Sequence, residues 1–157
     1  MGRNPTDRGK PGTKRGLLTE EDGGPLAAIV APANDHDSTL IRGVIEAVVV
    51  DRPADADEHL CLDKGFDTPD AEAAVRAAGY DPHIRRIGEE AKPCDASKGH
   101  KPRRWVVERT IGWLNRCRAI LIRYDKKAEN YLGLTQLACA LLWWRKLCHL
   151  HNAPVLG

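Results

Sequence analysis

The stretch H-L-C-L-D-K-G-F-D at residues 59–67 decides the fold. Its first four residues form a short, mostly apolar run, which predicts a β-strand over residues 59–62. Asp63 follows that run and stands directly before Lys64 and Gly65, a turn-forming pair. A carboxylate at the end of a strand is well placed to hold a metal ion. Considered alone, Asp63 is more simply a turn residue, so its role depends on the rest of the chain.

The segment after this strand carries the signals of a helix and then of a second strand. Thr68 is expected to be the N-cap, and Pro69 suits the first helical position. The alanine-rich residues 71–78 favour a helix, and Gly79 suits the position just after its end. A further strand is expected over residues 83–87, so the chain alternates strands and helices here.

The segment before the strand predicts a β-hairpin. Two strand-like runs, residues 13–19 and 25–31, flank the turn-forming sequence E-E-D-G-G at residues 20–24. Residues 1–16 are rich in Gly, Pro, Lys and Arg and lack an apolar period. This composition predicts a basic arm or loop at the start of the chain.

A helix is expected between the hairpin and the strand. It should begin within residues 34–38, with Asp37 or Ser38 as its cap, and end before Arg52. His36 and Asp37 could instead support a metal site. The apolar residues at helical spacing, which predict one buried face, are Leu40, Ile41, Val44, Ile45 and Val48.

The last third of the chain predicts a loop and two helices. Residues 88–102 contain Gly and Pro and little apolar content, which is typical of a loop. Helices are expected over residues 104–122 and 130–150. The predicted order of elements is therefore β-β-α-β-α-β-α-α, an α/β fold.

The composition indicates one folded domain. The chain has 157 residues, of which 42% are hydrophobic and 29% charged, and this suffices for a compact core. Its five cysteines form no C-x-x-C pair, which favours free thiols in a reducing cytoplasm. The most apolar segment, near residues 134–144, is shorter than the roughly 20 residues of a membrane span. We therefore expect a cytoplasmic protein without a membrane partner.

The net charge of +2 hides a strong division along the chain. Residues 1–16 hold five Lys or Arg against one Asp, and residues 17–100 hold eight against eighteen acidic residues. Residues 101–157 hold eleven basic residues against three acidic ones. An acidic middle between basic ends suits a body that binds cations and flanks that bind polyanions, although ordinary solvated surface has the same composition.

The predicted helix at residues 104–122 carries a second acid, Glu108, among several arginines. Alone, this glutamate is more simply a surface residue that balances its basic neighbours. The predicted core stripe consists of Val107, Ile111 and Leu114. The adjacent face, where DNA could approach, consists of Glu108, Gly112 and Asn115.

The same helix offers candidate phosphate contacts. Arginine binds phosphate in bidentate geometry, and the candidates are Arg104, Arg109, Arg116 and Arg118. Trp105 and Trp113 could stack on bases, but core packing explains them more simply.

Several stretches together resemble the catalytic half of bacterial insertion-sequence transposases of the DDE type. The strongest are residues 59–67, already quoted, R-W-V-V-E-R-T-I-G-W-L-N-R-C-R at 104–118, and R-Y-D-K-K-A-E-N-Y-L-G-L-T-Q-L-A-C-A-L-L at 123–142. The stretches N-P-T-D-R-G-K-P-G-T-K-R-G at 4–16 and A-N-D-H-D-S at 33–38 are also similar. The resemblance covers nearly the whole chain.

The resemblance implies a fold and an activity. The fold would be ribonuclease-H-like, a mixed sheet with flanking helices followed by two C-terminal helices. In such enzymes Asp, Asp and Glu hold two divalent metals, Mg²⁺ or Mn²⁺, that support cleavage of DNA ends and their joining to a target. Asp63 matches the second acid and Glu108 the third, so both are expected to be catalytic and metal-binding. The implied partners are transposon-end and target DNA, with a homo-oligomer as the active form.

The resemblance also implies that one acid is absent. In this family the first Asp lies on a central strand that precedes the stretch matching residues 4–10. We therefore expect a partial catalytic domain over residues 1–157: a basic arm at 1–16, a sheet with helices at 17–103, and basic helices at 104–157. Without the central strand, two half-sheets with open edges would remain.

An upstream transposase segment would be the missing partner, and the chain alone should be inactive. Asp7 is a poor substitute for the first acid, because no strand character holds it in place.

Two other functions remain open, a non-catalytic DNA-binding module and an inactive remnant. Cys148, His149 and His151 lack distant partners and are weak evidence for zinc. The apolar stripe at residues 134–147, which includes Trp143 and Trp144, is most simply the core side of a helix, although dimerisation through it is conceivable.

Overall fold

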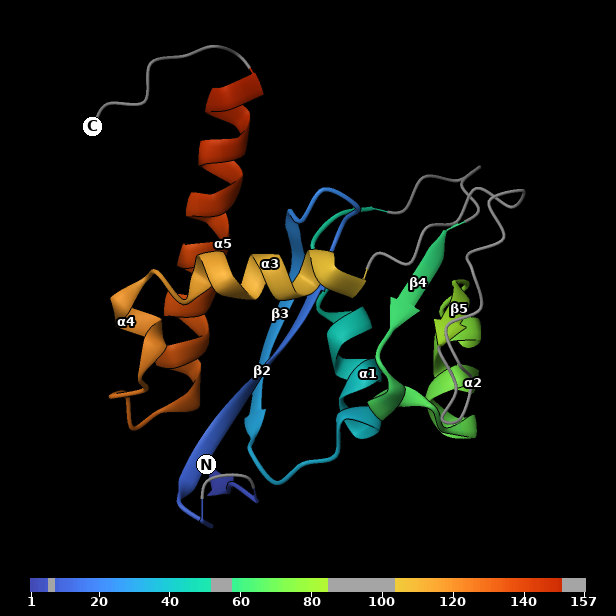
Figure 1. The fold of residues 1–157 in the computed structure, drawn as a ribbon, viewed down its shortest axis with the longest axis horizontal. Coiled ribbons are helices and arrows are strands. Elements are labelled where there is room, and N and C mark those ends of the chain that lie inside the picture. Colours follow the sequence, from blue (N-terminus) through green and yellow to red (C-terminus); the bar gives the residue numbers. More distant parts are fainter. Residues whose placement is uncertain (6–7, 52–57, 85–103, 151–157) are drawn as a thin grey trace.

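The computed structural model describes residues 1–5, 8–51, 58–84 and 104–150, with the side chains of Arg104 and Leu150 excepted. Figure 1 shows the arrangement of its helices and strands. The elements in chain order are β1 (Gly2–Arg3), β2 (Pro11–Thr19), β3 (Pro25–Pro32), α1 (Asp37–Glu46), β4 (His59–Leu62), the 3₁₀ helix η1 (Lys64–Phe66), α2 (Pro69–Ala77), β5 (Asp81–Ile84), α3 (Arg104–Leu114), α4 (Arg118–Leu121) and α5 (Ala128–Leu150).

The strands form two separate sheets. The first is antiparallel in the order β1-β2-β3, and its long hairpin runs from the pair Thr13 and Pro32 to the pair Thr19 and Pro25. The second is a parallel pair, β4 and β5, in which His59 lies opposite Asp81. Among the described residues, no strand joins the two sheets. The α/β class is confirmed, whereas the ribonuclease-H-like topology and the absence of a central strand stay predictions.

The hairpin is covered by helices on both faces. Successive strand residues point to opposite faces, so Leu17 and Leu18 enter different cores. Leu18 packs with Val44 of α1, while Leu17 packs against the cluster formed by Leu114, Ile120 and the α5 residues. Figure 1 shows α1 and α5 on opposite sides of the hairpin. The hairpin is therefore the middle layer of this part of the molecule.

Helix α1 connects the two sheets through apolar packing. Ile41 of α1 is buried with Ala71, Ala74 and Val75 of α2. Leu60 of β4 contacts both this cluster and the cluster between α1 and the hairpin. The β4–β5 pair is thus attached to the hairpin by side-chain packing on α1.

The expected hairpin, the strand before Asp63 and the alanine-rich helix are confirmed. Thr68 caps α2, its hydroxyl oxygen accepting from the backbone N–H of Ala71 at 3.3 Å, and Gly79 has the positive φ of 81° that favours glycine. The second strand begins at Asp81, two residues before its expected start. The expected end of that strand and the loop at residues 88–102 lie outside the described residues.

The predicted cap of α1 was wrong. His36 is the N-cap, and its side chain accepts a hydrogen bond from the N–H of Ser38 at 3.4 Å. Its Nδ1 atom also lies 2.7 Å from the Ser38 hydroxyl oxygen. Imidazole thus replaces the carboxylate or hydroxyl expected there. The helix ends at Glu46, so Val48 lies beyond it and packs on the hairpin cluster.

The single helix expected over residues 104–122 is broken into α3 and α4. The break lies at residues 115–117, where Cys117 has an extended ψ of 98°. Leu114 and Ile120 would lie roughly 120° apart around a continuous helix. Both are buried in one cluster, and the Tyr131 hydroxyl donates to the Ile120 carbonyl oxygen at 2.7 Å. Core packing therefore favours the break over helical continuity.

Other expectations for the two ends of the chain also change. Gly2–Arg3 and the residues from Pro11 onward lie in paired strands, so a loop over all of residues 1–16 was wrong. Helix α5 begins at Ala128, two residues early. No helix in the described part of the chain has the length and apolarity needed to cross a membrane.

The cysteines described are free thiols, namely Cys61, Cys117, Cys139 and Cys148. Burial raises the pKa of the Cys139 thiol to about 11, which keeps it protonated and inert near neutral pH. Cys94 lies outside the described residues. The expected free thiols are therefore confirmed for the four described cysteines.

Candidate functional site

Asp63 stands at the end of β4 and begins the strand-end turn, residues 63–66. It is the N-cap of η1, with extended backbone angles, and its Oδ1 atom accepts from the N–H of Lys64 at 2.6 Å. The residue is exposed. The strand and the turn hold the backbone on both sides, so the carboxylate is presented to solvent from a defined position.

The strand-end turn contacts α1, and α1 is in turn bound to β2. A Cβ atom placed on Gly65 would lie 3.4 Å from Oδ2 of Asp37, so the two segments touch. Asp37 also binds Lys14 of β2, whose Nζ atom lies 2.8 Å from Oδ1 of Asp37 and 2.6 Å from the Asp35 carbonyl oxygen. Three elements from distant parts of the sequence therefore meet beside Asp63.

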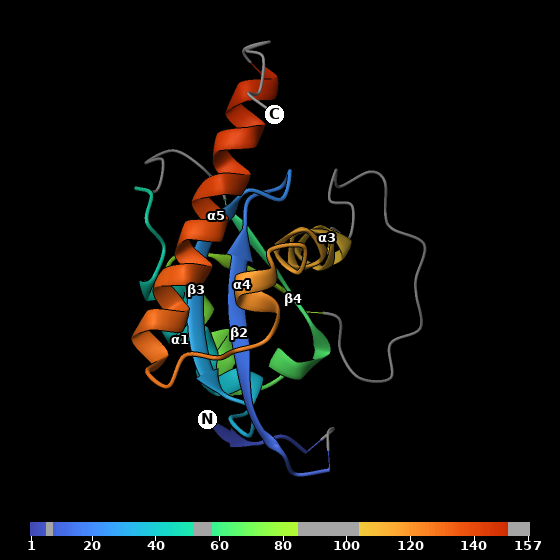
Figure 2. The ribbon, with the colours of Figure 1, turned by 90° about the vertical axis from the view of Figure 1, so that its left-hand side faces the viewer.

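Glu108 lies on an exposed face of α3, as predicted, together with Gly112 and Asn115. Both ribbon views place the first turns of α3 near the carboxyl end of β4, on the side of the hairpin where the strand-end turn lies (Figures 1 and 2). The two predicted acids thus come from elements that approach each other, while their side chains remain accessible.

The buried stripe of α3 differs from the prediction. Val106, Thr110 and Leu114 are at most 3% exposed, whereas Ile111 is 36% exposed and Val107 is half-buried. The Thr110 hydroxyl donates to the Gly23 carbonyl oxygen at 2.7 Å, with the Val106 carbonyl oxygen at 3.1 Å. A polar residue occupies the core position because the hairpin turn, residues 20–24, offers it a buried acceptor.

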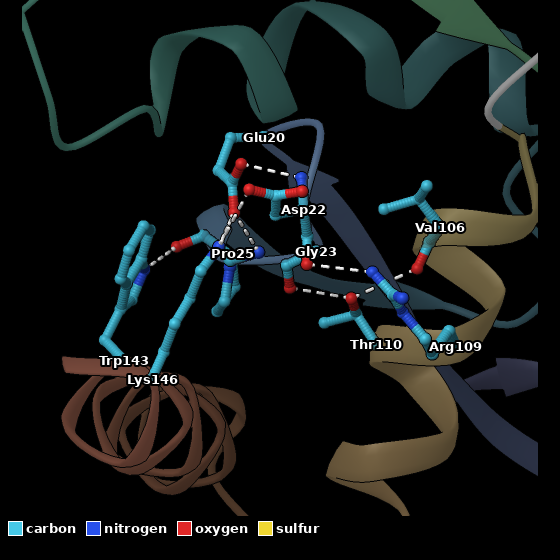
Figure 3. Close-up of polar contacts among 10 residues, drawn as sticks. Glu20, Asp22, Gly23, Pro25, Val106, Arg109, Thr110, Trp143 and Lys146 are labelled. Carbon is cyan, nitrogen blue, oxygen red and sulfur yellow. Dashed lines mark hydrogen bonds and ion pairs between the residues drawn. The ribbon is translucent and has the colours of Figure 1, made fainter. Parts of the chain in front are cut away.

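Arg109 supports the same contact, as Figure 3 shows. Its Nη2 atom donates to the Asp22 carbonyl oxygen at 2.8 Å. Its guanidinium carbon lies 4.5 Å from the ring centre of Trp105 and 4.9 Å from that of Trp113. Both tryptophans therefore contact this arginine, and the simpler expectation of core packing was wrong for Trp105, which is exposed. Arg109 has a structural role in the chain, and DNA contact by it stays a prediction.

The other side of the hairpin turn is held by α5. The Glu20 carboxylate accepts from the N–H groups of Asp22 at 2.7 Å and Gly24 at 2.6 Å, and it also binds the Lys146 ammonium group. Burial acts to raise the pKa of Glu20, but the hydrogen bonds from Lys146 and the turn outweigh it and lower the pKa below its usual value. The Trp143 indole N–H donates to the Pro25 carbonyl oxygen at 2.7 Å (Figure 3).

The structure thus presents two acids on exposed surfaces and a hairpin turn whose Gly23 and Gly24 are buried. The sequence matches the family described as the transposase DDE domain over residues 2–143. The chain belongs to the insertion-sequence DDE transposases.

A curated relative supports this assignment. The chain is 34% identical over 151 residues to a protein of Burkholderia cepacia described as "Putative transposase for insertion sequence element IS402". The aligned region covers 93% of this chain and 69% of the relative. No solved structure gives a significant match.

The other candidate DNA-binding and metal-binding residues are only partly described by the structure. Arg116 and Arg118 are exposed at the break between α3 and α4. The side chain of Arg104, Asp7 and His151 lie outside what the structure describes. His149 is exposed near the end of α5.

Trp143 contacts the hairpin as expected, but Trp144 is 64% exposed, so the predicted core stripe of α5 was wrong there. Leu137 and Leu141 are also exposed. The buried positions of α5 are Tyr131, Thr135 and Ala138.

Sequence reasoning missed the residues that brace the site. Lys14 and Lys146 were counted only as part of the basic ends, although each binds a specific carboxylate. The E-E-D-G-G sequence was identified as a turn, but its buried acceptors were not foreseen. One signal was present: a threonine in the middle of an apolar helix often marks a buried hydrogen bond.

Proposed function

We propose that Asp63 and Glu108 are two of the metal-binding carboxylates with which this transposase cleaves and joins DNA strands. The observation that carries the proposal is the position of Asp63: its carboxylate is exposed at the end of β4 and held by the Lys64 N–H at 2.6 Å. The exposed face of α3 that bears Glu108 begins near the same strand end. Both are the positions that the family resemblance assigns to acids.

The two side chains fit a hard divalent cation. Carboxylate oxygens are the ligands that Mg²⁺ and Mn²⁺ prefer, and both residues are open to solvent and substrate. One or two carboxylates together with substrate phosphates suffice for one Mg²⁺ ion. A pair of such ions, when bound, would supply an activated hydroxyl nucleophile and a stabilised leaving oxygen. The chain's own part is to hold the ligands and to place the phosphodiester against them.

A two-metal site needs at least one further carboxylate. We propose that it comes on a strand that pairs with the open edges of β2 and β4. Among the described residues, β2 is paired beyond β3 only through β1, at Pro11 and Gly12, and β4 is paired only with β5. A strand edge presents backbone N–H and C=O groups that pair readily with another strand.

The braces described above would position the catalytic turn. Lys14 offsets the charge of Asp37, and Asp37 lies against Gly65. Asp37 therefore supports the backbone beside Asp63 in this proposal, and it is a positioning residue. His36 is occupied as the cap of α1.

The basic C-terminal segment would bind the DNA backbone. Residues 101–157 carry eleven Lys or Arg against three acidic residues. Arg116 and Arg118 are exposed where α3 ends, on the helix that carries Glu108. Contacts of this kind position DNA without reading its sequence.

The proposal is tested by adding a strand that carries a third carboxylate. The chain is joined at its amino end to a strand ending in Asp, and cleavage of element ends is assayed with Mg²⁺. We expect activity in this protein, and a loss of at least about 1,000-fold in Asp63→Asn and in Glu108→Gln, equivalent to about 4 kcal/mol of barrier. Asp70→Asn on α2 and Glu129→Gln on α5 are matched controls that should stay active. Retained cleavage in Glu108→Gln would remove that residue from the site.

A second candidate function is DNA binding without catalysis, which the basic C-terminal segment favours on its own. The same experiment separates the two. DNA binding with no cleavage in the joined protein, at any Mg²⁺ or Mn²⁺ concentration, would favour the binding module.

A further inference from the structure

The other end of the β4–β5 pair carries a cluster that the transposase site does not use. His59 lies opposite Asp81, and Cys61 lies opposite His83, in the parallel register. Residues two apart on a strand share a face, so His59, Asp81 and His83 project from one face of this small sheet. The alternate residues of β4, Leu60 and Leu62, pack into the apolar core instead. The cluster is therefore on the face away from that core.

Three ligand atoms converge in this cluster. Nδ1 of His59 lies 2.9 Å from Nε2 of His83 and 3.4 Å from Oδ2 of Asp81. Nε2 of His83 lies 4.0 Å from the same Asp81 oxygen. The three side chains are 28%, 39% and 55% exposed for His59, His83 and Asp81, so an ion and a water molecule can reach them.

A single hydrogen bond accounts for the two imidazoles of this cluster but not for its carboxylate. Two imidazole nitrogens at 2.9 Å form an ordinary hydrogen bond, because neutral imidazole carries one N–H donor and one acceptor nitrogen. One shared proton satisfies that pair, but it leaves the carboxylate oxygen of Asp81 facing the same nitrogens. An ion in the centre receives a lone pair from all three atoms at once.

The separations fit a tetrahedral ion. Zinc bonds of about 2.0–2.1 Å place neighbouring ligand atoms roughly 3.3–3.4 Å apart. The observed distances of 2.9, 3.4 and 4.0 Å lie on both sides of that value, so small rotations of the side chains make the three equal. Three protein ligands leave a fourth position for water.

A second layer of contacts orients the carboxylate. Arg76 donates through Nη1 to Oδ1 of Asp81 at 3.3 Å, which leaves Oδ2 directed at the imidazoles. Arg76 is itself held by Glu72, one turn earlier on α2, at 3.0 Å. Partners of this type fix the orientation of metal ligands in proteins.

We propose that His59, Asp81 and His83 bind a divalent transition-metal ion of the Zn²⁺ class. Two imidazoles and one carboxylate suit Zn²⁺, Co²⁺ or Ni²⁺ and disfavour Mg²⁺, which prefers an all-oxygen shell. The site stands at the start of β4, four residues or about 13 Å from Asp63 at its other end. It clamps β4 to β5 and is separate from the carboxylate site, so it does not depend on the proposed catalysis.

The test is a titration of the full chain after removal of metal ions by a chelator. Calorimetry with Zn²⁺ should show one ion per chain, with no competition from millimolar Mg²⁺. His59→Ala and His83→Ala should each weaken Zn²⁺ binding by about 100-fold or more, and Arg76→Gln by about 10-fold. His149→Ala is the matched control, since this histidine is exposed on α5, and it should bind like the wild type.

Two further readouts make the result independent of how the variants fold. In the wild-type chain, Zn²⁺ should shift the imidazole ¹⁵N signals of two histidines, and Co²⁺ should give the visible absorption of a tetrahedral N/O site without thiolate charge-transfer bands. Unchanged Zn²⁺ affinity in folded His83→Ala, unshifted imidazoles, or thiolate bands would each overturn the proposal. Equal affinity for Mg²⁺ would also overturn it.

Discussion

The hairpin turn (residues 20–24) and the strand-end turn (residues 63–66) differ in how the chain encloses them. Side chains from α3 and α5 donate to the hairpin turn and its flank, through Thr110, Arg109 and Lys146. The strand-end turn has three exposed residues, with Asp63 among them. Enclosure of polar groups secures the fold, whereas exposure leaves a carboxylate available for a ligand. The hairpin turn therefore contributes mainly to stability, and the strand-end turn mainly to function.

The largest expected effect comes from Gly23 in the hairpin turn. Gly23 has φ of 89°, and a Cβ atom there would lie 2.8 Å from the buried Thr110 hydroxyl oxygen. We expect Gly23→Ala to lower the free energy of unfolding by about 2–4 kcal/mol, from backbone strain and overpacking together. Chemical denaturation followed by circular dichroism measures it.

Two other glycines are the controls for that change. Gly65→Ala in the strand-end turn meets Asp37 only at 3.4 Å, so it should cost less than about 1 kcal/mol. Gly133→Ala on α5 has nothing within 4 Å of the added Cβ and should stabilise the helix by about 0.5–1 kcal/mol. Equal costs at Gly23 and Gly65 would contradict the distinction between the turns.

The hydroxyl of Thr110 tests the enclosed hydrogen bond without changing side-chain volume. Thr110 is fully buried and donates to Gly23 at 2.7 Å, so Thr110→Val leaves a buried carbonyl oxygen without this donor. We expect a loss of about 1–3 kcal/mol in the free energy of unfolding. A Thr110→Val protein as stable as the wild type would show that this hydroxyl does not secure α3 to the hairpin.

DNA-binding measurements test the role of the exposed arginines that follow α3. Arg116→Ala and Arg118→Ala should each weaken binding to any sequence by a few-fold and reduce the salt slope, log K against log salt, by about 1. Fluorescence anisotropy at several salt concentrations measures both. Arg42→Ala, an exposed arginine on α1, is the control and should leave the slope unchanged. Salt-independent binding would defeat the assignment.

The smallest effect is a pH dependence at the hairpin turn. The pKa of Glu20 is lowered in the folded chain, so its contribution is complete above the unfolded pKa and is lost as pH falls through the folded one. Lys146→Met should reduce stability near neutral pH by about 1 kcal/mol and flatten its decline in acid. Arg145→Met, on an exposed neighbour, is the control. An acid profile identical to the wild type would show that the Lys146 contact does not stabilise the turn.

Local chemistry explains the elements that sequence reasoning predicted well. The cap at Thr68, the glycine after α2 and the run before Asp63 each act within a few residues. The hairpin follows from two short runs around a glycine turn. Caps, turns and short strands of this kind depend on neighbouring side chains, and no distant contact in the structure changed them.

The errors occurred where distant contacts compete with local preference. The helix expected from 104 to 122 breaks because Leu114 and Ile120 enter one core, and Thr110 replaces Ile111 on the buried face because Gly23 needs a donor. The cluster of His59, Asp81 and His83 depends on the register of two parallel strands that are over twenty residues apart. None of these partners is visible within a short window of sequence.

The sequence by itself determined the family, the segments of the hairpin and α2, and the two acids to be tested, because these depend on residue type and local spacing. Only the tertiary structure decided that Arg109 is held between two tryptophans, that Lys14 and Asp37 brace the strand-end turn, and that three metal-ligand atoms converge at the start of β4. The physical reason is that hydrogen bonds, ion pairs and metal ligation act over a few ångströms in space, whatever the separation along the chain.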